Sequence, residues 1–134
     1  MGNKKKGIAA ERELLHLLWD NKFACCRVAG SGSIPEPSCD LLAGNCDNKY
    51  AIEVKTSRKE KKYFDKNQVF EFKKFADRFG LTPVIAIKFL RAGWFFIFPK
   101  NLEKTSKGFA VSLEKARLKN IGLIENEVSQ KTNF

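Results

Sequence analysis

The sequence predicts an α/β fold in which a mixed five-stranded sheet is flanked by helices. Two segments carry apolar residues at helical spacing, five short segments are strand-like, and a Gly/Asn/Asp turn at 44–48 joins two of these strands as a hairpin. The order α-β-β-β-α-β-β implies a sheet with helices packed on it. With 134 residues, 43% of them apolar, we expect residues 1–134 to form a single domain with its own core.

An amphipathic helix is expected from about Gly7 to Asn21, because apolar residues recur there on one side of a 3.6-residue period. Its apolar stripe consists of Ile8, Leu14, Leu15, Leu18 and Trp19. Strands are expected at 23–29, 39–43 and 49–55. The intervening segment 30–38 is rich in Gly, Pro and Ser, so we expect it to be a flexible loop.

A second helix is expected from about Asp65 to Phe79, with Gly80 as its stop. Its expected stripe is Val69, Phe72, Phe75, Ala76 and Phe79. Phe70 lies off this stripe, so we expect it to be exposed or to belong to a dimer face. Strands at 83–90 and 94–98, a short helix at 111–119 and a mobile tail at 121–134 complete the expected order.

The chain is strongly basic, since 25 Lys and Arg residues against 15 Asp and Glu residues give a formal net charge of +10. Such a charge favours polyanions, because each phosphate that contacts Lys or Arg releases a condensed counterion. Nucleic acid is favoured over an anionic membrane or an acidic protein, although each basic cluster alone fits a solvated loop equally well. No segment approaches the roughly 18 apolar residues of a membrane helix. We expect a soluble, cytoplasmic, nucleoid-associated protein.

The cysteines and the single histidine narrow the range of chemistries. Cys25, Cys26, Cys39 and Cys46 lack the CxxC spacing typical of zinc sites. His16 has no Ser or Cys nucleophile beside it, which argues against a histidine-based triad. We expect the cysteines to be small buried residues of a protein in a reducing compartment.

Glu11 is the first anomalous acid, because it falls inside the apolar stripe of the first helix. A carboxylate directed at a core costs several kcal/mol unless it is paired or binds a cation. A buried salt bridge with Arg27 or Lys55 is the alternative to a functional role.

Asp40 and Glu53 are two further acids, and the predicted hairpin brings their strands together. Capping a turn is the alternative role for Asp40, and a same-face ion pair is the alternative for Glu53 and Lys55. Two clustered carboxylates repel each other, and in a cationic protein a divalent metal relieves that repulsion. Oxygen ligands of this kind suit Mg²⁺ or Mn²⁺, and Lys55 would then meet a phosphate and a water.

The spacing of these residues is similar to a known nuclease motif. Asp40, twelve intervening residues and then Glu53-Val54-Lys55 resemble the PD-(D/E)xK signature, with Ser38-Cys39-Asp40 in place of the usual Pro-Asp. The wider chain resembles the archaeal Holliday junction resolvases through the segments 6–15, 23–24, 27–31, 52–55, 84–89 and 93–94. The likeness covers residues from about 4 to 98 and continues more weakly to 112. Lys22, where the family often has Gly, and the loop 33–38 depart from the family pattern.

This resemblance implies a restriction-endonuclease-like fold and a homodimer that cuts four-way DNA junctions by paired, symmetric, metal-dependent hydrolysis. The implied metal ligands are Asp40, Glu53, the main-chain carbonyl of Val54 and, directly or through water, Glu11. Lys55 would orient or deprotonate the attacking water, and Ser31 matches a serine near the site. The implied ion is Mg²⁺, with Mn²⁺ as a substitute.

DNA contacts are expected from two arginines and from the basic clusters. Arg12 and Arg27 resemble family arginines that contact phosphates near the scissile bond. The further candidates are Lys4, Lys5, Lys6, Arg58, Lys59, Lys61 and Lys62. The tail 121–134 is a candidate for binding a replication or repair partner, with a frayed end as the alternative. Two alternative functions stay open: a non-catalytic basic nucleic-acid-binding module, and a nuclease of the same fold acting on mismatched or modified duplex DNA.

Overall fold

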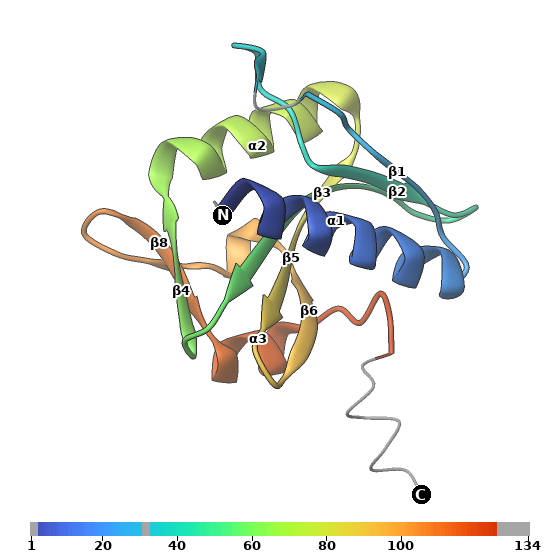
Figure 1. The fold of residues 1–134 in the computed structure, drawn as a ribbon. Coiled ribbons are helices and arrows are strands. Elements are labelled where there is room, and N and C mark those ends of the chain that lie inside the picture. Colours follow the sequence, from blue (N-terminus) through green and yellow to red (C-terminus); the bar gives the residue numbers. More distant parts are fainter. Residues whose placement is uncertain (1–2, 31–32, 126–134) are drawn as a thin grey trace, which may run out of the picture.

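The structure of the protein is a computed structural model, and it describes residues 3–30 and 33–125. Its main sheet has five strands in the spatial order β1-β2-β3-β5-β6 (Figure 1). They are β1 (Ala24–Arg27), β2 (Leu41–Gly44), β3 (Lys49–Ser57), β5 (Thr82–Phe89) and β6 (Gly93–Ile97). Strands β3 and β5 run parallel, and the other three neighbouring pairs are antiparallel. The mixed five-stranded sheet is therefore confirmed.

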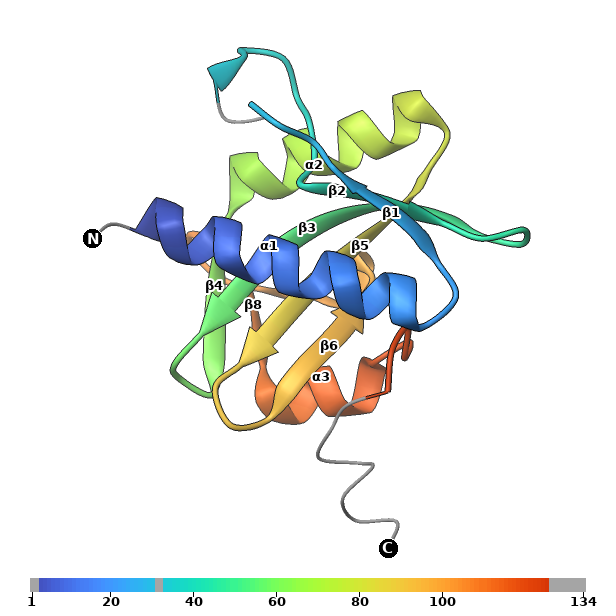
Figure 2. The ribbon, with the colours of Figure 1, turned by 45° about the vertical axis from the view of Figure 1, so that its right-hand side comes forward.

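Helices cover both faces of this sheet. Helix α1 (Asn3–Asp20) lies across one face (Figure 2), where Leu14 and Leu18 are buried in one core cluster with Ile52. Helices α2 (Lys66–Phe79) and α3 (Leu113–Lys119) belong to the opposite face, where Phe72 is buried in a second cluster with Ala51. Since Ala51 and Ile52 are neighbours in β3, successive strand residues serve opposite cores. None of the helices that the structure describes is long and apolar enough to cross a membrane.

A second sheet was missed by the sequence interpretation. It has three strands in the order β4-β8-β7, formed by β4 (Lys61–Asp65), β8 (Gly108–Ser112) and β7 (Glu103–Lys104), and a 3-10 turn, η2 (Pro99–Asn101), precedes β7. The lysines of β4 resembled a basic loop, and β8 was partly merged with the following helix. Gly108 is required where β4 and β8 meet, because a Cβ there would lie 2.3 Å from the Phe64 carbonyl oxygen.

The apolar stripes of the two long helices differ in part from the prediction. Their buried centres are Ala10, Leu14 and Leu18 in α1 and Val69, Phe72 and Ala76 in α2. Trp19 and Phe79 lie at the helix ends and are 56% and 60% exposed, so their assignment to the core was wrong. The Trp19 indole N–H still donates to the Cys25 carbonyl oxygen at 2.9 Å.

The structure also tests three smaller expectations, for the cysteines, for Phe70 and for the C-terminal segment. Cys25 and Cys39 are buried free thiols as predicted, whereas Cys26 and Cys46 are exposed, which corrects the prediction for those two. Phe70 is 47% exposed, as expected for a residue off the stripe. Residues 121–125 are not frayed, because the Ile121 N–H donates to the Phe96 carbonyl oxygen and Ile124 is buried. Residues 126–134 lie outside the described part of the chain.

Candidate active site

The hairpin of β2 and β3 brings Asp40 and Glu53 together. Leu41 pairs with Ile52, so the preceding Asp40 stands opposite Glu53 on the same face of the sheet. The Asp40 N–H donates to the Ile52 carbonyl oxygen at 3.0 Å, which extends the pairing one residue beyond β2. Asp40 therefore lies directly before its strand, and not within it as the sequence suggested. The approach of the two acids that the hairpin predicted is confirmed.

The Asp40 carboxylate is fixed by a main-chain hydrogen bond. Its Oδ2 accepts from the Val54 N–H at 2.8 Å, so a side chain replaces the main-chain acceptor where β2 has ended. Because the N–H and C=O of one strand residue point to the same side, the Val54 carbonyl faces this same edge. The geometry thus gathers two carboxylates and one main-chain oxygen at the start of β2.

Asp40 strongly perturbs the ionisation of Glu53. Burial, the negative charge of Asp40 and a hydrogen bond to Asp40 together raise the pKa of Glu53 to about 8, while Lys55 opposes the rise. Lys55 Nζ lies 4.0 Å from Glu53 Oε2, and both side chains are on one face as strand alternation predicted. One lysine does not neutralise two adjacent carboxylates, so this pair of acids is short of positive charge.

Glu11 approaches the same edge from α1. Its Oε1 lies 3.9 Å from Arg27 Nε, so the salt bridge with Arg27 that the sequence left open is present. Burial and then the charge of Asp40 raise the pKa of Glu11, and Arg27 lowers it. Glu11 is therefore electrostatically coupled to Asp40 while its carboxylate is paired with an arginine.

The oxygen atoms at this edge fit a divalent cation, although in the described part of the chain only two acidic side chains meet there and not the three that the sequence predicted. Among the residues that the structure describes, no group of three or more His, Cys, Asp or Glu side chains could hold a metal ion. What the edge offers instead is Asp40, Glu53 and the Val54 carbonyl, all of them hard oxygen ligands. An ion at this place would remove the repulsion that raises the pKa of Glu53. The role of Glu11 as an outer ligand stays a prediction.

A pocket of about 280 Å³ opens over the two acids, and helix α2 forms one of its walls. Besides Asp40, Glu53 and Lys55, it is lined by Gln68 and Glu71. The sequence interpretation missed both α2 residues, because only the fold shows that α2 lies over the hairpin. Their spacing of one helical turn was the available signal.

The basic candidates are distributed unevenly around this pocket. Burial and the charge of Lys55 lower the pKa of Lys62, which places Lys62 near the site. Lys61, next to it in β4, lies 3.9 Å from Glu103. Lys5, Arg12, Arg58 and Lys59 are exposed. Ser31 and the side chains of Lys4 and Lys6 lie outside what the structure describes, so their roles stay predictions.

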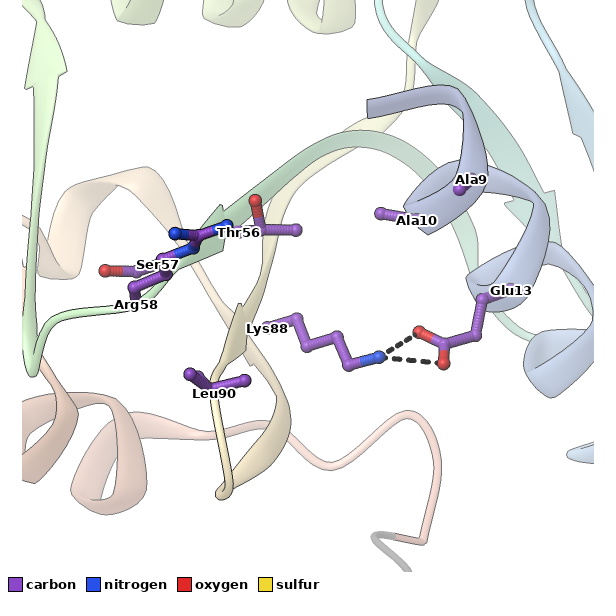
Figure 3. Close-up of a pocket in the computed structure, with 8 residues that line it drawn as sticks. All are labelled: Ala9, Ala10, Glu13, Thr56, Ser57, Arg58, Lys88 and Leu90. Atoms are coloured by element: carbon purple, nitrogen blue, oxygen red, sulfur yellow. Dashed lines mark hydrogen bonds and ion pairs between the residues drawn. The ribbon is translucent and has the colours of Figure 1, made fainter. Parts of the chain in front are cut away.

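A second pocket, of about 370 Å³, lies between α1 and the ends of β3 and β5 (Figure 3). It also contains an acid and a lysine, but here the two side chains form an ion pair with each other. Lys88 Nζ donates to both carboxylate oxygens of Glu13, at 2.8 and 2.6 Å, and the Trp94 indole N–H donates to the same carboxylate at 3.1 Å. Arg58 lines this pocket and not the pocket of Asp40 and Glu53.

Comparison with known proteins places this architecture in a family. The family model for the archaeal Holliday junction resolvase (Hjc) matches residues 2–131. The chain belongs to this family. The Hjc crossover junction endodeoxyribonuclease of Archaeoglobus fulgidus is 41% identical over 108 residues, which cover 81% of this chain and 79% of that protein. The corresponding protein of Methanocaldococcus jannaschii is 36% identical over 107 residues, covering 80% and 76% of the two chains.

A solved structure of the Holliday junction resolvase family supports the same assignment. The Archaeoglobus fulgidus Hjc structure matches with a TM-score of 0.80 at 38% sequence identity, and the match covers 85% of this chain and 94% of that one. The restriction-endonuclease-like fold expected from the sequence is therefore confirmed. Membership in this family of nucleases also implies dependence on a divalent metal ion.

Proposed function

We propose that the chain resolves four-way DNA junctions by paired, symmetric, metal-dependent cleavage of phosphodiester bonds. The observation that carries this proposal is the pairing of Asp40 and Glu53 beside Lys55, at an edge where the acids outnumber the cations. It is supported by relatives that are named crossover junction endodeoxyribonucleases. Residues 1–134 would act as one nuclease domain, and association with the nucleoid would follow from the DNA substrate.

Asp40 and Glu53, with the Val54 carbonyl, would hold Mg²⁺, and Mn²⁺ would substitute. When bound, the ion would supply a more acidic water and stabilise the charge on the leaving 3′ oxygen. Lys55 is placed to orient or deprotonate the attacking water and to neutralise charge on the phosphate. The Val54 N–H keeps the Asp40 carboxylate turned toward Glu53. Arg27 balances Glu11 and presents a guanidinium group for a DNA phosphate.

A homodimer suits this function, because a junction with two-fold symmetry is best matched by a protein with two-fold symmetry. The Phe70 side chain on α2, which is 47% exposed, is the proposed contact between two copies. The Phe70 ring is held edge-on to Phe109, with ring centroids 6.1 Å apart. Light scattering on wild type and Phe70→Glu tests this: a dimeric wild type and a monomeric variant are expected, and an unchanged dimer would move the interface elsewhere.

The decisive test of function is a substrate panel in Mg²⁺ that contains a four-way junction, a plain duplex and a mismatched duplex. Paired nicks in the junction and little cutting of the plain duplex are expected. Asp40→Asn and Glu53→Gln should bind the junction and fail to cut it. Comparable cutting of plain duplex would reject junction selectivity, and preferential cutting of the mismatched duplex would favour the second nuclease function. Normal cutting by Asp40→Asn would reject the proposed metal site.

The non-catalytic binding module is disfavoured by the arrangement of the acids. A binding module has no need for Asp40 and Glu53 to face each other. Their repulsion would lower its stability and would contribute nothing to binding. The approach of these two carboxylates therefore favours the enzyme. Junction binding without cleavage, in wild type with Mg²⁺ or Mn²⁺, is the result that would revive the module.

A further inference from the structure

Helix α2 contributes a wall of the active-site pocket that has no assigned role. Gln68 and Glu71 line the same cavity of about 280 Å³ as Asp40, Glu53 and Lys55. These two residues are one helical turn apart, so they present their side chains on one side of α2. The next residue, Phe72, also lines the pocket and is only 3% exposed, which anchors this side of the helix in the core.

The backbone of this wall is fixed at its beginning. Asp65 caps α2, and its Oδ2 accepts from the Gln68 N–H at 3.1 Å. Val69, the neighbour of Gln68, is buried to 4% exposure. The Gln68 side-chain amide, in contrast, has no hydrogen-bond partner within the described part of the chain. Gln68 is exposed, and on this anchored helix it lines the pocket of Asp40 and Glu53 with an amide that is available to a ligand.

The chemistry of the pocket calls for a donor at this position. A phosphodiester brings two non-bridging oxygens that carry negative charge, and each is stabilised by hydrogen-bond donors. Asp40, Glu53 and Glu71 are acceptors when ionised, and among the described residues that line the pocket Lys55 alone is cationic. Gln68 is uncharged and supplies two N–H donors on the wall formed by α2.

We propose that Gln68 is a catalytic residue whose Nε2 donates a hydrogen bond to a non-bridging oxygen of the scissile phosphate. This inference rests on the proposed function of the same pocket and adds a substrate contact from α2. Gln68 is not a metal ligand in this assignment. Its contribution grows as negative charge accumulates on the phosphate oxygens during cleavage, so it affects the rate more than the binding of the junction.

The test compares wild type with three variants on a four-way junction under single-turnover conditions in Mg²⁺. Gln68→Ala should cut about 10- to 100-fold more slowly, the range expected when a hydrogen bond to a charged group is lost. Gln68→Glu keeps the size of the side chain, removes the donor and adds a repelling charge, so it should be at least as slow. Asn67→Ala, at an exposed neighbour that does not line the pocket, should cut like wild type.

Two further measurements separate a phosphate contact from a structural or metal-binding role. Junction affinity without divalent metal and the Mg²⁺-induced rise in melting temperature should both be unchanged in Gln68→Ala. Loss of the Mg²⁺-induced rise would make Gln68 a metal ligand and overturn the assignment. Equal loss of binding and rate would make it a general binding residue, which also overturns the catalytic role.

The outcomes for wild type and variant distinguish this inference from the proposed function. If wild type cuts the junction and Gln68→Ala or Gln68→Glu cuts within twofold of it, the role of Gln68 is wrong and the proposed function stands. If wild type itself leaves the junction intact, both fail together.

Discussion

The two faces of the central sheet carry pockets of similar size and similar residue types, yet their charges are arranged in opposite ways. On the α1 face, Glu13 is matched by Lys88 and by the Trp94 indole. On the α2 face, Asp40 and Glu53 face each other, Lys55 lies beside Glu53, and the pKa of Glu53 is raised. The α1 pocket is the larger, at about 370 Å³ against about 280 Å³.

This difference is the reason why we propose the α2 pocket, and not the α1 pocket, as the active site. A carboxylate that already holds a lysine and an indole N–H is satisfied, and it joins α1 to the sheet as a structural contact. The negative charge of Asp40 contributes to the raised pKa of Glu53, and a bound cation would relieve this repulsion. Unbalanced charge, and not cavity volume, therefore marks the candidate active site.

The largest expected effect on cleavage comes from a comparison of two variants, in which Lys55 and Lys88 are replaced separately. Lys55→Met should lower the rate of junction cleavage by about 10² to 10⁴-fold, because it removes the group that we propose acts on the attacking water. Lys88→Met should leave the rate within about threefold of wild type, since Lys88 contacts Glu13 on the other face. Single-turnover cleavage of a labelled junction measures both. Equal losses in the two variants would mean that the two faces do not differ in function.

A divalent metal should stabilise the folded protein through the α2 face alone. At a metal concentration about 100-fold above its dissociation constant, binding to the native state adds about 2.7 kcal/mol of stability. Mg²⁺ or Mn²⁺ should therefore raise the melting temperature of wild type and of Glu13→Gln, but not that of Asp40→Asn. Differential scanning fluorimetry with and without EDTA reads this directly. A full rise in Asp40→Asn would remove Asp40 from the metal site.

The sequence was sufficient to predict the main sheet and the approach of Asp40 to Glu53. Alternation along β3 separates Ile52 from Glu53, and the turn at 44–48 dictates the pairing that places Asp40 opposite Glu53. The second sheet was not predicted because β4 begins with two lysines and lacks the alternation of apolar and polar residues that is typical of a strand. The position of α2 over the hairpin is a tertiary property, so the contribution of Gln68 to the pocket was invisible in the sequence.

Glu11 and Glu13 show the limit of helical periodicity. Helical periodicity places Glu11 inside the apolar stripe and Glu13 on the polar side, but it does not indicate which residues Glu13 contacts. In the structure Glu13 reaches Lys88 and Trp94, residues 75 and 81 positions further along the chain. Contacts over such sequence distances depend on how the helix is placed on the sheet, and no local pattern encodes that placement.

The raised pKa of Glu53 predicts an effect of pH on the metal-free protein. The pKa of Glu53 is higher in the folded state, at about 8, than in the unfolded state. Its protonation therefore contributes its full stabilisation when the pH is below the pKa of the unfolded state, and this stabilisation is lost as the pH rises through the pKa of the folded state. Wild type should therefore lose stability relative to Glu53→Gln between about pH 5 and pH 8. Urea unfolding of both proteins in EDTA measures the difference. A difference that is independent of pH would show that Glu53 titrates normally.

The smallest effect is expected from the contact between Glu13 and Lys88. Both side chains are more than one-third exposed, at 43% and 39%, so solvent screens their attraction in spite of the bidentate geometry. A double-mutant cycle of Glu13→Gln and Lys88→Met should give a coupling energy of about 0.5 to 1 kcal/mol in urea unfolding. Cleavage by Glu13→Gln should stay within about threefold of wild type. A much larger coupling, accompanied by loss of cleavage, would show that this contact sets the position of α1, and with it Glu11, at the active site.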